Sequence, residues 1–141
     1  MRTNRRVVRI EWGDCDPAGI IFYPRYFALF DASTQILFGR AGCALRDLQK
    51  QYGMIGFPLV DARARFLVPS GYGEEVTIES AISEFRRSSF QVEHRVYKGE
   101  ALAVEGFEVR VWVVPSMSKP GQIEARPIPP EVVKRFAPSE S

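Results

Sequence analysis

Apolar and polar residues alternate in the first part of the chain, with the period of a half-buried strand. This strand is expected to run from Arg5 to Gly13, with Val8, Ile10 and Trp12 on one face. Later segments repeat the strand pattern and are bounded by turn-forming residues. They comprise residues 58–66, 75–85, 89–97 and 100–114.

The pattern between the first strand and the later ones predicts a long helix and then a short one. Proline suits a first helical position, so the long helix is expected to run from Pro24 to about Arg40, with Gly42 at its C-cap. Its apolar side chains cover most of its circumference, which is typical of a buried helix. Residues 45–52 favour the short helix, and residues 130–136 favour a terminal one.

This order of elements predicts an α+β fold. One sheet cannot bury an apolar helix on all sides unless it curls around that helix, so we expect a curved antiparallel sheet. In the last strand the apolar positions change from even to odd numbers at Glu105 and Gly106, which predicts a β-bulge. The side of the helix or sheet left uncovered predicts a dimer or a higher assembly.

Composition narrows the class of protein. The chain has 141 residues, 45% hydrophobic and 26% charged, so residues 1–141 are expected to form one globular domain. No apolar run approaches the roughly 20 residues of a membrane span, and no secretory signal is recognisable. Two cysteines are too few for a disulfide framework, so a cytoplasmic location is expected. A net charge of +2 argues against a nucleic-acid partner.

The densest polar cluster is Asp14-Cys15-Asp16-Pro17, between the first strand and the long helix. Both aspartates could simply cap a turn. Alternatively, one carboxylate could act as nucleophile or base on a carbonyl whose oxygen binds the N–H groups of the helix N-terminus. The single histidine, His94, excludes a zinc site built from histidines, whereas a dyad of Cys15 and His94 stays open.

The segment from Glu11 to Pro24, EWGDCDPAGIIFYP, resembles the signature of the 4-hydroxybenzoyl-CoA thioesterase family. The similarity continues at residues 30–32, and more weakly at residues 56–58 and 84–90. The resemblance implies a hot-dog fold, in which a curved five-stranded antiparallel sheet wraps around a long central helix. It also implies hydrolysis of an acyl-CoA to free acid and CoA without a metal or other cofactor. The enzyme would be a homo-oligomer, a dimer or a dimer-of-dimers tetramer, with its site at a subunit interface.

The resemblance also assigns roles to residues. Asp16 would be the catalytic carboxylate, as nucleophile or as base for water, and Asp14 its structural partner in the loop. The backbone N–H at the helix start, near Tyr23, would hold the thioester oxygen, because Pro24 has no N–H to donate.

Binding residues follow from the same comparison. Arg86 and Arg87, and more weakly Arg126, match basic residues that meet the CoA phosphates, although Ser88 stands where the family's type enzyme has lysine. Asp31 matches a residue near the acyl end of the pocket, where it could accept a hydrogen bond from a substrate hydroxyl or amine. Solvated arginines and an aspartate paired with an arginine are the structural alternatives.

An aryl-CoA such as a hydroxybenzoyl-CoA is the favoured substrate. The type enzyme has a tryptophan in the stretch matching residues 44–47, which this chain lacks, so a short or branched aliphatic acyl-CoA stays open. A hot-dog dehydratase is a second alternative. It would need a histidine near the helix, and the first half of this chain has none. A non-catalytic acyl-CoA or acyl-carrier binding module is the remaining alternative.

Overall fold

The computed structural model describes residues 2–138. The strand β1 (Thr3–Arg9) leads through a short 3-10 turn (Trp12–Asp14) to the helices α1 (Pro24–Arg40) and α2 (Leu45–Tyr52). Four strands follow: β2 (Leu59–Phe66), β3 (Glu75–Phe85), β4 (Ser89–Lys98) and β5 (Ala101–Val111). The chain continues into the hairpin β6 (Val113–Pro115) and β7 (Ile123–Ala125), and then into α3 (Pro130–Lys134).

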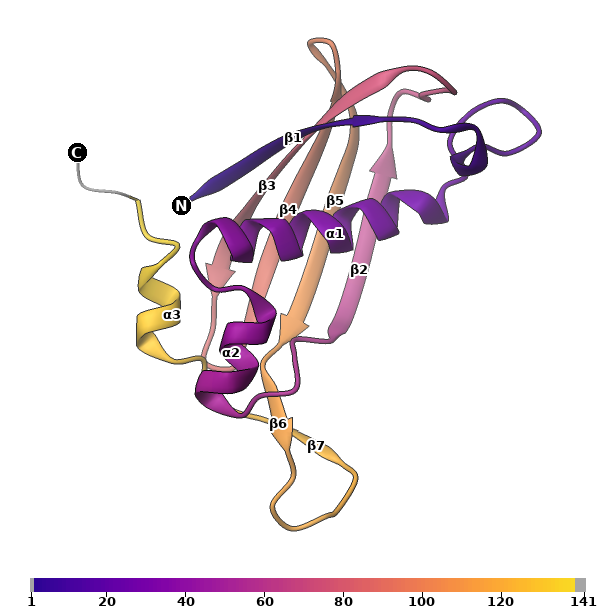
Figure 1. Ribbon diagram of the computed structural model, residues 1–141. Helices are drawn as coiled ribbons and strands as arrows, with labels where there is room; N and C mark the ends of the chain where they lie inside the picture. The colour runs from indigo at the N-terminus through magenta and orange to yellow at the C-terminus, as the bar shows by residue number, and fades with distance from the viewer. Residues whose placement is uncertain (1, 139–141) are drawn as a thin grey trace.

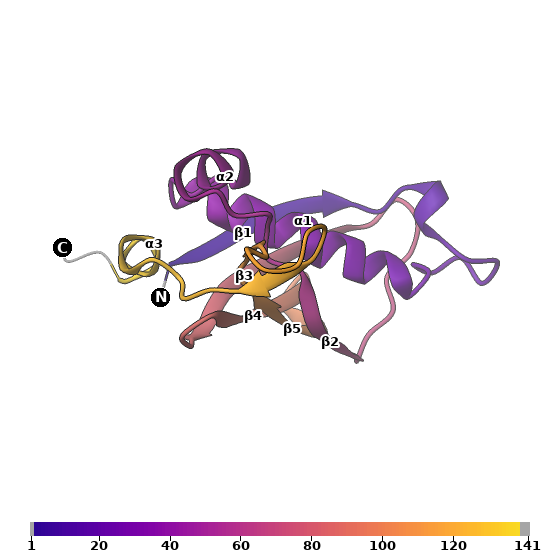
Figure 2. The ribbon, with the colours of Figure 1, turned by 90° about the horizontal axis from the view of Figure 1, so that it is seen from below.

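The main sheet has five antiparallel strands in the order β1-β3-β4-β5-β2. The sheet is curved, and α1 lies across one of its faces (Figures 1 and 2). This arrangement confirms the predicted α+β hot-dog fold. No helix within residues 2–138 is long and apolar enough to cross a membrane.

The core lies between α1 and the sheet in two apolar clusters. One surrounds the start of α1, where Phe30 packs with Ile10 and Ile78. The other surrounds its end, where Phe38 packs with Phe90 and Trp112. The opposite side of α1, which includes Ala28, Asp31 and Ala32, is exposed. The apolar pattern of α1 predicts a helix that is buried on nearly every side. A single chain leaves one of these sides exposed.

The β-bulge predicted at Glu105 and Gly106 is wrong. The pairing of β5 with β2 and β4 is continuous there, and the buried positions stay even through Gly106, Glu108 and Arg110. Position 106 requires glycine, because a Cβ there would overlap the ring of Phe30. Glu108 and Arg110 are charged but lie on the buried face, so the apolar residues of this segment indicated the wrong face.

Local boundaries also differ from expectation. The first strand ends at Arg9, and Trp12 is 73% exposed in the 3-10 turn, so it does not share the buried face of Ile10. The terminal helix α3 ends at Lys134, two residues before the predicted end. The β6–β7 hairpin was not predicted, because its strands have only three residues each.

Candidate active site

Asp16 lies in the loop between β1 and α1, where backbone hydrogen bonds fix its position. The Asp16 N–H donates to the Ile20 carbonyl at 2.9 Å, and the Gly19 N–H donates to the Asp16 carbonyl at 2.9 Å. Gly19 has a φ of 81°, which favours glycine. The Ala18 N–H donates to Asp16 Oδ1 at 2.8 Å. Within residues 2–138, Oδ2 has no hydrogen-bond partner and is free for chemistry.

Asp14 braces the same loop. Its Oδ2 accepts the Glu11 N–H at 3.0 Å, and its carbonyl oxygen accepts the Phe22 N–H at 2.8 Å. These bonds link both ends of the loop. They support the structural role that the family resemblance implies for Asp14.

Within residues 2–138, the start of α1 offers a backbone donor that no acceptor occupies. The N–H groups of Arg25 and Tyr26 donate to the carbonyls of Phe22 and Tyr23, and Pro24 has none. In the described part of the chain, the Tyr23 N–H has no acceptor. It therefore matches the position expected to bind the thioester oxygen.

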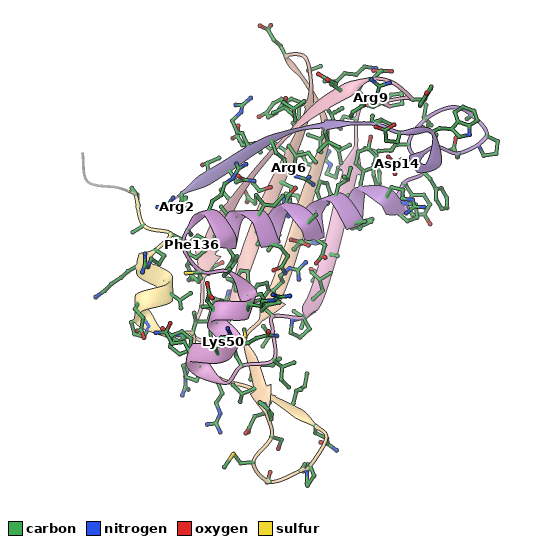
Figure 3. All side chains as sticks on the ribbon, in the orientation of Figure 1. Arg2, Arg6, Arg9, Asp14, Lys50 and Phe136 are labelled. Carbon is green, nitrogen blue, oxygen red and sulfur yellow. The ribbon has the colours of Figure 1, made fainter. Side chains whose placement is uncertain are left out.

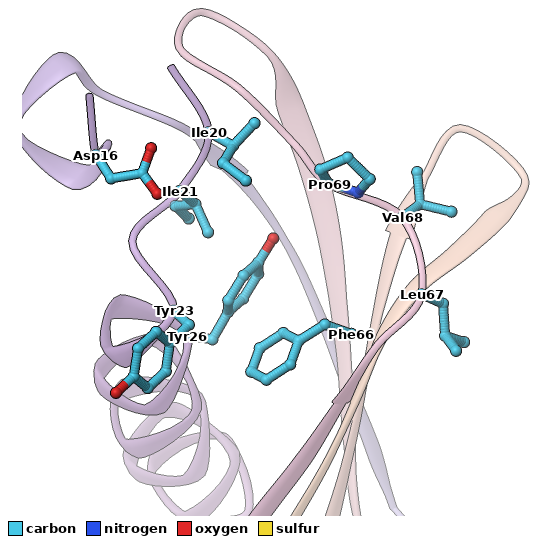
Figure 4. Close-up of a pocket in the computed structure, with 9 residues that line it drawn as sticks. All are labelled: Asp16, Ile20, Ile21, Tyr23, Tyr26, Phe66, Leu67, Val68 and Pro69. Atoms are coloured by element: carbon cyan, nitrogen blue, oxygen red, sulfur yellow. The ribbon is translucent and has the colours of Figure 1, made fainter. Parts of the chain in front are cut away.

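Asp16 and Tyr23 line a pocket of about 310 Å³. In Figure 4 they lie on one wall, and Phe66, Leu67, Val68 and Pro69 form the facing wall. Tyr26 stands between the walls with only 3% of its surface exposed, and burial raises the pKa of its phenol. The sequence predicted a buried apolar helix and offered no motif in residues 66–69, so it did not identify this lining.

The three predicted phosphate-binding arginines lie together, but far from this pocket. Arg86 and Arg87 follow β3, and β3 begins beside the loop that contains Asp16, where Glu75 pairs with Arg9. The eleven residues of β3 span roughly 35 Å. Backbone hydrogen bonds join Arg87 to Ile128 and Arg126 to Trp112, so Arg126 lies at the same end of the sheet. The side chains of Arg86 and Arg126 pair with neighbouring glutamates at 3.3 and 3.0 Å.

Asp31 lies outside the pocket of its own chain. Its side chain is 57% exposed, and its Oδ1 accepts a hydrogen bond from Arg110 Nη2 at 2.7 Å. The ion pair was the structural alternative for this residue, but it leaves the second carboxylate oxygen available. Sequence analysis did not identify Arg110 as part of this constellation.

Glu108 links Arg110 to a polar network inside the core. Its Oε2 accepts from Arg110 Nη2 at 2.7 Å, and its Oε1 accepts from the Thr34 hydroxyl and lies 2.9 Å from His94 Nε2. Ser80 Oγ lies 2.6 Å from His94 Nδ1. Burial favours the neutral acid, but the hydrogen bonds from His94, Arg110 and Thr34 outweigh it and lower the pKa of Glu108 to about 2.

The lowered pKa of Glu108 predicts a specific acid sensitivity. The folded-state pKa lies below the ordinary value of 4.5, so its stabilisation is present above pH 4.5 and is lost as the pH falls toward 2. The loss is on the order of 3 kcal/mol. Urea unfolding between pH 2.5 and 7 should show that Glu108→Gln lacks this component. An unchanged pH dependence in the variant would contradict the assignment.

The geometry excludes the dyad of Cys15 and His94 that the sequence left open. Both ring nitrogens of His94 are engaged by Ser80 and Glu108, and the ring stacks on Phe30 at 4.7 Å. The Cys15 thiol instead faces the Glu11 carbonyl at 3.6 Å. His94 is a buried structural residue. Among residues 2–138, no cluster of three His, Cys, Asp or Glu side chains is arranged to hold a metal ion.

The curved five-stranded antiparallel sheet crossed by the long helix α1 is a hot-dog fold. Residues 10–136 match the Thioesterase-like superfamily, and the chain belongs to this superfamily. It is 37% identical over 112 residues to a 4-hydroxybenzoyl-CoA thioesterase from Pseudomonas sp. (strain CBS-3), covering 75% of this chain and 79% of that one. It is 25% identical over 92 residues to a 1,4-dihydroxy-2-naphthoyl-CoA hydrolase from Synechococcus elongatus, covering 65% and 66%.

Solved structures agree with this assignment. A 4-hydroxybenzoyl-CoA thioesterase variant with an aspartate replaced by asparagine, complexed with 4-hydroxybenzoyl-CoA, superposes with a TM-score of 0.89. The two chains are 30% identical, and the match covers 97% of this chain and all of that one. A gentisyl-CoA thioesterase superposes with a TM-score of 0.79 at 31% identity, covering 94% and 98%.

Proposed function

We propose that this protein hydrolyses an aryl-CoA thioester to the free acid and CoA. The observation that carries the proposal is the Tyr23 N–H and the free Asp16 oxygen on one wall of an apolar pocket. The carbonyl oxygen binds the N–H, which stabilises the negative charge that develops during attack. Asp16 attacks the carbonyl carbon or takes a proton from the attacking water. The carbon–sulfur bond then breaks, and the thiolate of CoA leaves and takes up a proton. If Asp16 is the nucleophile, water hydrolyses the mixed anhydride left on its carboxylate, which releases the free acid and restores Asp16. If Asp16 is the base, the attack of water yields the free acid directly, and the proton that Asp16 took from water is available for the thiolate.

The same proposal includes a dimer formed through the edge strand β2. Seven of its eight residues are exposed, and within residues 2–138 its outer edge pairs with no strand. The other edge strand, β1, is partly covered, because Arg40 Nη1 donates to the Arg5 carbonyl at 3.1 Å. An uncovered edge with exposed Leu59, Val60 and Phe66 suits pairing with a second copy. Residues of the second copy would then complete the pocket at the dimer interface.

The position of the arginines supports a site shared between subunits. Arg86, Arg87 and Arg126 lie roughly 35 Å from the catalytic loop of their own chain, by the length of β3. Of the three, Arg126 lines a second cavity of about 520 Å³ that also includes Trp112, Pro127 and Pro129. We assign them to the CoA phosphates of a site on another subunit, in a dimer or a dimer of dimers.

A panel of CoA esters tests this function. Benzoyl-, 4-hydroxybenzoyl-, phenylacetyl-, short-chain and long-chain acyl-CoA are compared by release of free thiol. We expect turnover of the aryl esters, because the pocket walls are aromatic and apolar. Turnover of aliphatic esters alone would overturn the aryl assignment. No turnover by the folded oligomer would favour a non-catalytic acyl-CoA or acyl-carrier binding module.

The expected cytoplasmic location also remains a proposal. Cys15 and Cys43 are both free thiols, as is usual for proteins in reducing compartments.

A further inference from the structure

We propose that the Tyr26 hydroxyl is a catalytic hydrogen-bond donor that stabilises the CoA thiolate as it leaves, and that Ser70 is its positioning residue. The inference rests on the proposed thioesterase function. It adds to that function a group that acts on the sulfur atom, whereas the Tyr23 N–H acts on the carbonyl oxygen.

The Tyr26 hydroxyl lies inside the pocket, although most of its side chain belongs to the core. Its ring packs between those of Phe30 and Phe66, at centroid distances of 6.4 and 5.6 Å, and only 3% of the residue is exposed. Figure 4 shows the hydroxyl between the two walls of the pocket. A buried tyrosine hydroxyl usually has a hydrogen-bond partner. Within residues 2–138 this one has only the incomplete contact with Ser70, so it is available to a bound substrate.

Ser70 adjoins the phenol from the facing wall, directly after Pro69. Its side chain is 1% exposed, and in the described part of the chain its Oγ has no full hydrogen bond. It is nevertheless close enough to the phenol to lower its pKa. A buried hydroxyl without a full partner costs the fold free energy, so stability alone does not explain the pair. Because a hydroxyl donates and accepts at once, Ser70 can donate to the phenol oxygen while the phenol donates into the pocket.

The wall that holds Ser70 is tied to the loop that holds Asp16. The Ser70 carbonyl accepts the Ile21 N–H at 2.8 Å, and Ile20 forms a β-bridge with Gly71. A Cβ on Gly71 would come within 2.9 Å of the Gly19 carbonyl oxygen, so the two segments are in close contact. The position of the hydroxyl pair is therefore fixed relative to the reacting carboxylate.

The phenol keeps its proton at neutral pH. Burial raises its pKa above the ordinary value of 10.0, Ser70 opposes this shift, and Glu74 and Cys15 add to it. An alkyl thiol has an ordinary pKa of about 8.5, so Tyr26 does not transfer its proton to the thiolate. It donates a hydrogen bond instead, and hydrogen bonds to charged acceptors are stronger than neutral ones.

The sulfur atom is the acceptor that this donor suits. Negative charge develops on the carbonyl oxygen and then on sulfur, and the Tyr23 N–H serves the oxygen in the proposed mechanism. Among the described residues that line the pocket, three have polar side chains: Asp16, Tyr23 and Tyr26. Asp16 supplies an acceptor, and the Tyr23 hydroxyl points the opposite way from that of Tyr26 (Figure 4). The Tyr26 hydroxyl is therefore the side-chain donor that the pocket offers to sulfur.

The step needs no further reactant. When the carbon–sulfur bond breaks, its electron pair stays on sulfur, and the thiolate accepts the hydrogen bond from Tyr26. If Asp16 was the base, the thiolate then takes the proton that Asp16 holds. If Asp16 was the nucleophile, the thiolate takes the proton that hydrolysis of the anhydride releases. Tyr26 keeps its own proton in both routes.

The first test varies the basicity of the leaving thiol. Benzoyl-CoA and S-benzoyl-N-acetylcysteamine release an alkyl thiol, whereas S-(4-nitrophenyl) thiobenzoate releases a much more acidic thiol that leaves without help. Tyr26→Phe should lower kcat/KM about 30-fold for both alkyl thioesters, as expected for one hydrogen bond to a charged group, and less than about threefold for the nitrophenyl thioester. Ser70→Ala should lower it about fivefold for the alkyl thioesters and less than about twofold for the nitrophenyl thioester.

The matched control is Tyr97→Phe. Tyr97 is a partly exposed tyrosine at the end of β4 and does not line the pocket, so its variant should stay within about twofold on all three esters. Tyr26→Phe and Ser70→Ala should unfold at the same temperature as the unsubstituted protein or above it, because neither hydroxyl has a full partner within residues 2–138.

The second test needs no turnover. The thiol of CoA bound to the protein is titrated by the ultraviolet absorbance of its thiolate. The pKa of this thiol should lie about 1 pH unit lower in the unsubstituted protein than in Tyr26→Phe, because the hydroxyl favours the thiolate. The same thiol pKa in both proteins would overturn the proposal.

Other results would also overturn it. Equal losses on all three esters would do so, because a donor to the carbonyl oxygen or to the attacking water acts whatever the leaving group. Equal losses together with a lower unfolding temperature would assign Tyr26 to the core alone. Absence of turnover by the unsubstituted protein would instead overturn the thioesterase function itself, so the two failures are distinguishable.

Discussion

Asp16→Asn should lower kcat for aryl-CoA hydrolysis by about 10³-fold while leaving substrate affinity within about threefold. The amide keeps the size of the side chain and its acceptor oxygen for the Ala18 N–H. It removes the charge needed to attack the carbonyl or to take a proton from water. Single-turnover kinetics with 4-hydroxybenzoyl-CoA, together with binding of a non-hydrolysable thioether analogue, separate the two quantities.

The matched control for this variant is Asp47→Asn. Asp47 is an exposed carboxylate in the first turn of α2, so the same change from carboxylate to amide is made away from the Asp16 loop. Its kcat should stay within about twofold, because the change lies outside the pocket. If Asp16→Asn kept full turnover, or if it lost affinity and kcat together, the assignment of Asp16 as the reacting carboxylate would fail.

Disrupting the β2 edge should yield a monomer with much lower activity. In the double variant Leu59→Lys/Val60→Lys, two exposed apolar side chains become positive charges on a strand that already contains Arg63 and Arg65. In an antiparallel pair these charges face those of the second copy, and the repulsion opposes association. We expect a folded monomer by light scattering and circular dichroism, with kcat/KM lowered about 100-fold, equivalent to a loss of about 3 kcal/mol of transition-state binding.

The control for the edge variant is on the opposite edge of the sheet. Val7 in β1 is 64% exposed, close to the 63% of Val60, and Val7→Lys adds one positive charge, as each substitution in the edge variant does. This protein should remain oligomeric and active. A monomeric edge variant with full activity would refute a shared site. An edge variant that stays dimeric and active would place the dimer interface elsewhere.

The catalytic loop is the part of the site that the sequence predicted most fully. Asp16, the Tyr23 N–H and the helix start at Pro24 are neighbours in the chain, so their proximity follows from local structure. The extents of β3 and β4 were predicted for the same reason, because the alternation of apolar and polar residues that marks a strand is a local signal.

Contacts between distant segments could not be read in this way. Glu108 and Arg110 lie on the buried face of β5, whereas apolar residues such as Val109 lie on the other face, so the hydrophobic pattern pointed to the wrong side. Their charges are tolerated inside because His94, Thr34 and Asp31 supply partners from other elements. The spacing of residues along the chain does not predict such partners.

The sequence by itself determined the order of elements, the long helix and the loop that presents Asp16, because these depend on interactions between residues close in the chain. The tertiary structure decided the rest. It showed that Phe66 faces Tyr23 across the pocket, that Arg110 holds Asp31, and that the arginines lie at the far end of the sheet. These relations depend on how strands pair and how α1 crosses them, and such long-range packing is fixed only when the whole chain folds.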